Sequence, residues 1–469
     1  MKLPFFISFI LSSITIWGQV NTGFSQVQIH KLKGGCKIIG NNIVSVNATE
    51  AYNDIGYHAK KNDRLPMVYV DIDDNTNTFS SSSASLELPE TTNKIVKAGL
   101  YWAATYQYGK GDIKKKENEY IYTNEADRVD DFNIILFKTP DSAYTTITGK
   151  ILEDQKDSIG RPYLCYADVT EVLNGSKKTS GSYTVANMRA SEGHILGGSS
   201  GGWMLMVVYE NPEEPLRQID IYEGFKSVSE SFFEVEVDIG DNFNKETDNV
   251  QLFLGVLEGD ERLKTDEVTI KAQDYAEKKP LYSKVRPQNN FFNSSITYFG
   301  EIVDNRNPNS INTLGFDLAT MDITKYKSSG SGKLEIKFNS VRDAFLLFFM
   351  GVAKEIHTNE TSVAKQIAVK DTVVNLTDSL KIRESFRIEG ISPGYYLVTN
   401  VFSNDELASK WKLRVETLGL KPKSFVNPKK NWEYIYVAEG KSIEDCYPTY
   451  VDLRKNPEFK DAWLLEILE

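Results

Sequence analysis

The sequence predicts a mainly β protein in which two β-sandwich units precede a small α+β domain. Short runs that are apolar throughout, or that alternate apolar with polar residues, are separated by Gly, Asn, Asp and Ser along most of the chain. The 24 tyrosines and 24 phenylalanines add to this preference for strands. An apolar repeat of helical period is present only after residue 391.

The N-terminal residues 1–25 have the composition of a secretory signal peptide. Lys2 precedes an apolar stretch over residues 5–17, and small residues follow as far as Ser25. The stretch is too short for a stable membrane span. We therefore expect cleavage after Gly18 or Ser25, an exported chain, and no transmembrane span in the mature protein.

Charge and cysteine content exclude two classes of protein. The formal charge of −11 disfavours nucleic acid as a partner, because phosphate contacts need a basic surface. Three cysteines are too few for a disulfide framework in an exported chain. The sequence leaves open whether Cys36 and Cys165 pair, which would leave Cys446 free.

Residues 26–355 carry the strands of the two predicted sandwich units, 26–212 and 213–355. One order of parts occurs twice: residues 165–170 (CYADVT) and 319–324 (ATMDIT) are each followed by a Gly/Ser turn, an alternating strand and an apolar strand. Two related units are the simplest account of this repeat. The predicted strands are residues 94–106, 133–138, 182–188, 203–209, 216–222, 232–239, 250–256, 333–339 and 344–352.

The remaining residues divide into a linker, 356–391, and a C-terminal domain, 392–469. The linker is polar and has no clear period. The sequence pattern of this domain predicts the element order βαββαβ. The predicted strands are 395–401, 422–426, 432–437 and 462–467, and the predicted helices are 403–418 and 442–454. Ser403 and Glu406 are expected to form the capping box of the first helix, and Gly419 to end it. The expected buried face of this helix consists of Leu407, Trp411, Val415 and Leu418.

Aromatic residues crowd the predicted central strands of this domain. Alternation places Trp432, Tyr434 and Tyr436 on one face of the sheet. Since both helices are expected on the other face, the aromatic face is either open for contact with a glycan or a protein partner, or covered by another domain.

Residues 197–201 (GGSSG) match the G-x-S-x-G motif of serine hydrolases, which needs a strand before the serine and a helix after it. Here a predicted strand follows. We therefore expect Ser199 and Ser200 to lie in a flexible turn and the protein to have no catalytic residue. The paired carboxylates that cleave glycosides are not distinguished in so acidic a chain.

Asp71, Asp73 and Asn75 alternate like the first ligands of a calcium loop. The pattern then fails, because Thr76 stands where such a loop needs Gly and Ser82 where it needs Glu. A solvated turn is the expectation, with calcium at these three residues as the alternative. No other cofactor is predicted, and the four histidines have no metal-ligand spacing.

The run GYYLVTNVFSNDELASKWKLRVETLGLKPKSFVNPKKNWEYIYVAEGKSIEDC resembles a SPOR-type domain. The resemblance implies a ferredoxin-like fold that binds peptidoglycan glycan strands stripped of their peptides. Residues 34–212 resemble modules of very long surface adhesins of flavobacteria and related Bacteroidetes, in segments such as GGCKIIGNNIVSV, VYVDIDDNTNTFSSSSASLELP and AGLYWAATY. The combination is similar to accessory proteins of gliding-adhesin assemblies and type IX secretion.

These resemblances imply a non-enzymatic structural or interaction protein of the bacterial cell envelope. Its expected partners are envelope proteins of an adhesin or gliding complex and peptidoglycan. Because the C-terminus does not resemble a type IX sorting domain, we expect the periplasm or the outer membrane rather than the cell surface. The alternative function is a secreted carbohydrate-binding or carbohydrate-processing protein.

Overall fold

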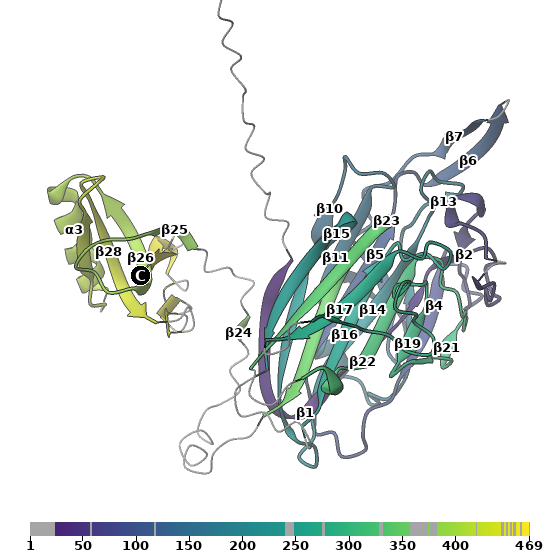
Figure 1. Ribbon diagram of the computed structural model, residues 1–469, viewed down its shortest axis with the longest axis horizontal. Helices are drawn as coiled ribbons and strands as arrows, with labels where there is room; N and C mark the ends of the chain where they lie inside the picture. Colours follow the sequence, from purple (N-terminus) through teal and green to yellow (C-terminus); the bar gives the residue numbers. More distant parts are fainter. Residues whose placement is uncertain are drawn as a thin grey trace, which may run out of the picture. The chain divides into compact units, whose positions relative to one another are not determined.

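The computed structural model describes residues 24–56, 59–116, 119–239, 248–273, 277–327, 332–356, 374–375, 382–418, 420–441, 445–446, 449–450, 453, 456–459 and 462–468. Within them the chain forms two units, Met1–Val374 and Asn375–Glu469 (Figure 1). Strands dominate the described chain, so the predicted mainly β class is confirmed. The predicted signal peptide up to residue 23, and residues 357–373 and 376–381 of the predicted linker, lie outside the described residues.

Hydrogen bonds join the strands of the first unit into two main sets. One set has the order β21-β4-β12-β8-β9, and the other has the order β10-β11-β5-β14-β1-β15-β23-β16-β22-β19-β20. Smaller ladders join β13, β6 and β7, join β2 to β3, and add β17 and β18 beside β23. The strands are β1 (Ser25–Asn42), β2 (Val44–Ser45), β3 (Val68–Tyr69), β4 (Ser81–Leu86), β5 (Lys94–Thr105), β6 (Lys110–Lys116), β7 (Glu119–Ala126), β8 (Ile134–Lys138), β9 (Thr145–Thr148), β10 (Lys150–Asp154), β11 (Pro162–Asp168), β12 (Gly181–Ala186), β13 (Glu192–Gly193), β14 (Gly201–Glu210), β15 (Leu216–Asp238), β16 (Val250–Leu257), β17 (Asp266–Ala272), β18 (Lys279–Pro280), β19 (Ile296–Tyr298), β20 (Glu301–Ile302), β21 (Arg306–Asn307), β22 (Phe316–Asp322), β23 (Lys333–Glu355) and β24 (Val374–Asn375).

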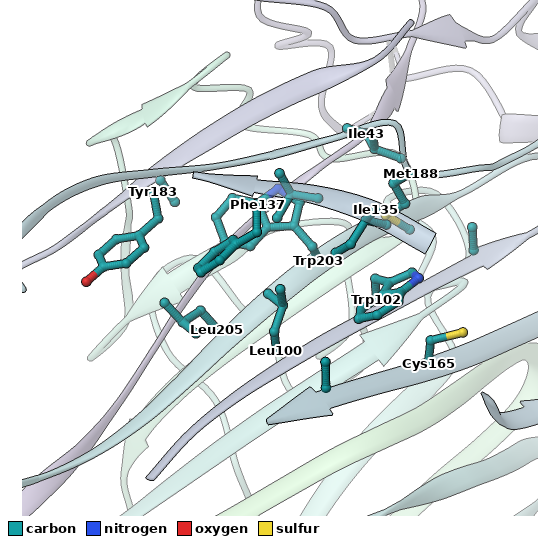
Figure 2. Close-up of a cluster of buried hydrophobic side chains, with 14 of the residues drawn as sticks. Ile43, Leu100, Trp102, Ile135, Phe137, Cys165, Tyr183, Met188, Trp203 and Leu205 are labelled. Atoms are coloured by element: carbon teal, nitrogen blue, oxygen red, sulfur yellow. The ribbon is translucent and has the colours of Figure 1, made fainter. Parts of the chain in front are cut away.

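The first unit has three apolar cores, one in each half and one between the halves. The core of each half, called an outer core below, lies between two layers of strands. In the first half, β4, β8 and β12 face β5, β11 and β14 across a core that contains Trp102 and Trp203, which pair between β5 and β14 (Figure 2). Both indole N–H groups are satisfied, because Trp102 donates to the carbonyl of Phe132 at 3.0 Å and Trp203 to Ser82 Oγ at 2.9 Å. In the second half, β16 and β22 share a core with β17 and with both ends of β23.

A third core joins the two halves. Tyr101 of β5 and Phe349 of β23 lie ring to ring at 5.4 Å, and the Tyr101 hydroxyl donates to Glu223 of β15 at 2.8 Å. Met204, Met206 and Phe348 belong to the same core. The long strand path therefore folds back on itself, and its two halves pack face to face.

Strand β1 passes from one half to the other. Its residues up to Lys33 pair with β15, and its residues from Gly34 pair with β14. The boundary predicted between residues 212 and 213 therefore does not divide two separate compact units. A shared strand and a shared core hold residues 24–356 in one unit.

Two pairs of predicted strands are each one long strand. Residues 216–222 and all but the last residue of 232–239 lie in β15, and residues 333–339 and 344–352 both lie in β23. Register shifts in the β15–β23 ladder mark bulges, one of which lies beside Glu230 at a φ of 46°. A bulge bends a strand without ending it, so the polar residues at these points give the pattern of a turn.

The predicted internal repeat corresponds to one local structure built twice. Thr170 begins the short helix α1 (Thr170–Asn174), and its Oγ1 accepts a hydrogen bond from Ala98 N at 2.9 Å. Thr324 begins the 3-10 helix η3 (Thr324–Tyr326), and its Oγ1 accepts from Val250 N at 3.0 Å. The residue before each threonine donates its N–H to the carbonyl of that same Ala98 or Val250.

The C-terminal unit is a five-stranded sheet with helical segments on one face. Its strand order is β25-β29-β26-β28-β27. Its elements are β25 (Ile382–Phe386), β26 (Gly394–Phe402), α3 (Asp405–Thr417), β27 (Lys423–Asn427), β28 (Trp432–Gly440), η4 (Pro457–Phe459) and β29 (Trp463–Ile467). Among the described residues of the predicted second helix, 445–446, 449–450 and 453 are helical. In the described part of the chain, no helix is long and apolar enough to cross a membrane.

Two local expectations for α3 are wrong. The side chain of Asn404, not Ser403, caps the helix by accepting from the backbone N–H groups of Glu406 and Leu407 at 2.9 and 3.0 Å. Leu407 is 51% exposed, whereas Val415 is fully buried against the sheet. Gly419 lies outside the described residues.

The three cysteines are free and buried. Cys36 belongs to the core between the two halves, and Cys165 to the outer core of the first half. The pairing that the sequence left open is therefore not formed in this structure.

Candidate functional site

The GGSSG loop is buried and tightly bonded. Ser199 and Ser200 are 1% and 0% exposed. Ser199 Oγ donates to the carbonyl of Ser191 at 2.6 Å, and Ser200 N donates to Thr105 Oγ1 at 2.9 Å. The loop leads directly into β14, without a helix, so the geometry of a nucleophile elbow is absent as expected. The expected flexible turn is wrong, however, because both serines are fixed by hydrogen bonds.

Ser200 connects this loop to a carboxyl group of the second half. Its Oγ donates to Glu258 Oε1 at 2.7 Å, and the Glu258 backbone N–H donates to the carbonyl of Gly315 at 2.7 Å. Glu258 lies just after β16 with φ at 73°, a region that L residues other than Asn and Asp rarely occupy. Gly315 has no room for a side chain, since an added Cβ would lie 2.6 Å from Ser200 Cβ.

The environment of Glu258 favours its protonated form. Burial raises the pKa of the Glu258 carboxyl to about 7, the hydrogen bond from Ser200 lowers it in part, and the nearby Asp260 carboxylate raises it further. Burial also raises the pKa of Asp260 and of Glu261, whose Oε1 accepts the backbone N–H of Gly56 at 2.7 Å. A carboxyl group of this kind can transfer a proton near neutral pH.

Sequence reasoning missed this acidic loop. The run Glu258-Gly259-Asp260-Glu261 directly follows the buried strand β16, which is the only signal that the sequence offers. Among the described residues, no group of three His, Cys, Asp or Glu side chains is placed to hold a metal ion.

The predicted calcium residues lie in a turn that follows β3, and their oxygens already accept hydrogen bonds. Asp71 Oδ1 accepts from Ser81 Oγ at 2.8 Å, and Asp73 Oδ1 accepts from Thr78 Oγ1 at 2.8 Å. Asp73 Oδ2 accepts from the Tyr144 hydroxyl. Although burial acts against it, the Tyr144 and Thr78 hydrogen bonds hold the pKa of Asp73 below its ordinary value.

Asn75 takes part in the same turn. Its N–H donates to Asp73 Oδ1 at 3.2 Å, and its Oδ1 accepts from Asn77 N at 3.0 Å. The side chains of the turn therefore bond to protein groups in several directions instead of converging on one point. Calcium at Asp71, Asp73 and Asn75 stays the untested alternative to a solvated turn.

In the C-terminal unit, the predicted aromatic face is the one opposite α3, but most of it is covered. Tyr434 and Tyr436 are 0% and 9% exposed and pack with Phe425, Tyr396 and Trp463. Phe425 and Tyr434 stack with ring centroids 5.6 Å apart. Of the three aromatic residues predicted to meet a ligand, only Trp432 is accessible, at 42% exposure.

The residues that cover this aromatic face were predicted to belong to the linker, 356–391. Strand β25 pairs in parallel with β29, and Phe386, Ile388 and Ile391 join the aromatic cluster. Glu384 of β25 accepts the Tyr434 hydroxyl at 2.6 Å. The domain therefore extends N-terminal to residue 392, and the alternation of apolar and polar residues from Phe386 to Glu389 is the signal that could have shown it.

Two charged side chains lie beside Trp432. Lys430 Nζ lies 5.3 Å from the centroid of the Trp432 ring and pairs with Glu384 at 3.2 Å. An exposed indole flanked by a cation and a carboxylate can stack on a flat apolar surface and hydrogen-bond the polar groups around it.

Comparisons with known proteins leave the family open. No protein-family model matches the chain, and no curated protein matches it. The crystal structure of the major capsid protein P2 from bacteriophage PM2 is 10% identical with a TM-score of 0.19, covering 69% of this chain and 99% of that one. The crystal structure of a BuGH86 variant in complex with neoagarooctaose is 10% identical with a TM-score of 0.18, covering 73% of this chain and 35% of that one. Similarities this weak carry no argument about fold or function.

Proposed function

We propose that the chain is a non-catalytic structural protein of the bacterial cell envelope, an accessory component of a gliding-adhesin assembly. In this proposal it acts in the periplasm or at the outer membrane, the first unit contacts envelope proteins, and the C-terminal unit holds a peptidoglycan glycan strand or a neighbouring protein. The observation that carries the proposal is the exposed Trp432 beside the aromatic face of the C-terminal sheet.

The strand order of the C-terminal unit supports a SPOR-type, ferredoxin-like domain. Leaving β25 aside, the chain enters at β26 in the middle of the sheet, and the order across the sheet is β29, β26, β28, β27. This is the order in which a βαββαβ chain places both helices on one face. The opposite face is then available to a ligand wherever β25 and the residues after it leave it uncovered.

Trp432 has the chemistry to bind a glycan stripped of its peptides. The C–H face of a sugar ring packs on an indole by dispersion and burial of apolar surface. Lys430 and Glu384 add a donor and an acceptor for sugar hydroxyl groups. Tyr434 and Tyr436 support the strand from beneath, because their rings are buried in the cluster.

The first unit supports a holding role in this proposal. We infer that its two halves are related β-sandwich units that pack into one rigid body. Three apolar cores and a strand common to both halves leave few independently moving parts. Such a body transmits force between partners better than two units on a flexible linker.

Co-sedimentation of the full chain with purified peptidoglycan sacculi tests the proposal. The wild-type chain should sediment with sacculi, and Trp432→Ala should remain largely in the supernatant. Leu413→Ala is the matched control, because Leu413 is 64% exposed on α3, away from the aromatic face. A wild-type chain that sediments neither with sacculi nor with an envelope protein would contradict the proposal.

A carbohydrate-processing enzyme is the second candidate, and the acidic loop is the observation in its favour. Glu258, whose pKa is raised to about 7, and the neighbouring Asp260 supply two carboxyl groups in different environments. Release of reducing sugars from polysaccharides by the wild-type chain, abolished in Glu258→Gln, would favour this candidate over the structural role.

A further inference from the structure

A small groove lies in the first unit, and Glu258 is not among the residues that line it. It lies where β1 and β4 meet β19, β22 and the residues from β20 to β21. Most of the residues that line it are apolar, and the others include hydroxyl and amide side chains. The lining residues used below are Ile38, Ser85, Tyr298, Val303, Asn305 and Arg306.

An exposed aromatic pair stands at one side of the groove. Tyr298 lines it and is 45% exposed, and Phe299 is 42% exposed and packs edge-on against Tyr298 with ring centroids 4.4 Å apart. Phe299 and Gly300 form the two-residue turn between β19 and β20, with φ at 47° and 85°.

Phenylalanine is unfavourable in this turn in two respects. A turn with positive φ at both central residues prefers Asn or Asp followed by Gly, and an L residue with a large side chain is strained there. Its ring also stays partly in water. Backbone strain at an exposed aromatic residue points to a binding role for the aromatic pair.

The groove has one charged lining residue, Arg306, and the exposed carboxylate of Asp304 lies close enough to act on it. The Arg306 guanidinium donates to the carbonyls of Val303 and Ser310 and to Asn41 Oδ1 at 2.7–2.9 Å. Burial and the nearby Glu214 carboxylate raise the pKa of the Tyr298 hydroxyl, and Glu214 itself pairs with Arg217. Asn305 is exposed and Ser85 partly exposed, so the rim offers an amide and a hydroxyl as hydrogen-bonding groups.

We propose that this groove binds one ring of a neutral oligosaccharide. Tyr298, held by Phe299, stacks on the C–H face of the sugar, while Asn305 and Ser85 hydrogen-bond its hydroxyl groups. An anionic ligand would leave its charge uncompensated here, because the Arg306 guanidinium already donates to protein groups. A peptide that adds a strand to β1 is disfavoured as the ligand, because β4 already lies beside β1. Asn41 Nδ2 of β1 donates to the carbonyl of Ser83 of β4 at 3.0 Å.

Calorimetric titration of the full chain with neutral tetra- to hexasaccharides of glucose, xylose, mannose and galactose tests the proposal. At least one should bind, and Tyr298→Ala should weaken that binding at least about tenfold. Phe299→Asn should also weaken it while raising the melting temperature, because Asn tolerates the left-handed turn. Phe232→Ala is the matched control, since Phe232 is 58% exposed on β15 and does not line the groove.

The outcomes separate this site from the C-terminal unit. Binding that is weakened by Tyr298→Ala but unchanged by Trp432→Ala supports the groove, even if sacculus binding fails. Binding weakened by Trp432→Ala alone overturns the proposal. So does the absence of binding to every oligosaccharide, or a Tyr298→Ala variant that loses a co-purifying protein while sugar binding is unchanged.

Discussion

Arg286 and Asp317 form an ion pair that is closed to solvent. Arg286 Nη1 lies 2.8 Å from Asp317 Oδ1, and the two side chains are 0% and 1% exposed. The guanidinium also donates to Thr297 Oγ1 and to the carbonyls of Phe291, Ser295 and Leu318. The pair thereby fixes the segment before β19 against β22, and with it the strand that carries Tyr298.

Arg286→Met should lower the free energy of unfolding by about 3–5 kcal/mol, because it leaves the Asp317 charge buried without its partner. Urea unfolding followed by tryptophan fluorescence measures this loss. Lys284→Met is the control, since Lys284 and Glu301 are 3.7 Å apart and 81% and 70% exposed, and such pairs contribute little. Equal effects of the two substitutions would contradict a structural role for the buried pair.

Glu258 should make stability depend on pH. In the folded chain burial raises the pKa of its carboxyl to about 7 from the ordinary value of 4.5. The folded state therefore holds this proton more tightly, so the contribution of Glu258 to stability is full below about pH 4.5 and is lost as the pH rises through about 7.

Glu258→Gln keeps the acceptor for Ser200 but does not titrate. The melting temperature of this variant relative to wild type should therefore rise between about pH 5 and about pH 8. Glu301→Gln, at an exposed position, should show the same difference at both values. A Glu258→Gln difference that is independent of pH would show that Glu258 ionises normally.

Calcium should leave the stability of the chain unchanged, because Asp71, Asp73 and Asn75 already accept protein hydrogen bonds. If calcium did bind there, a concentration of one hundred times its Kd would raise the free energy of unfolding by about 2.7 kcal/mol. Thermal melts with calcium and with a chelator measure the difference. A stabilisation that disappears in Asp73→Asn would establish the calcium site instead.

Thr170→Val and Thr324→Val should destabilise the chain by similar amounts, about 1 kcal/mol each. Each removes the side-chain acceptor of one backbone N–H at the equivalent point of its half. Thr146→Val on the exposed strand β9 is the control. Clearly unequal losses, measured by urea unfolding, would argue against equivalence of the two halves.

Trp411→Ala should destabilise the C-terminal unit by about 3–5 kcal/mol. Its ring packs against Phe459 at 6.0 Å, and its Nε1 donates to Thr399 Oγ1 at 3.1 Å. Trp432→Ala should leave the unit folded, because this ring is 42% exposed. Hydrogen exchange of β26 amides in the full chain distinguishes the two results, and unfolding by Trp432→Ala would contradict the assignment of the sheet faces.

The sequence by itself determined the elements whose own residues form a clear apolar pattern. Apolar runs predicted β14 and β16 closely and alternation predicted β28, while the helical period predicted α3 and the burial of Val415. It did not predict that Asn404 would cap α3, because Ser403 and Asn404 are both good capping residues and the approach of the chain selects between them.

Tertiary structure alone decided how these elements combine. The path of β1 through both halves depends on backbone hydrogen bonds, which carry no sequence pattern. The pairing of β25 with β29 joins residues far apart in the chain and covers Tyr434 and Tyr436. Ser200 and Glu258 likewise meet only because the two halves pack face to face. Side-chain periodicity records which face of an element is buried, whereas the neighbour that buries it is determined by contacts across the whole chain.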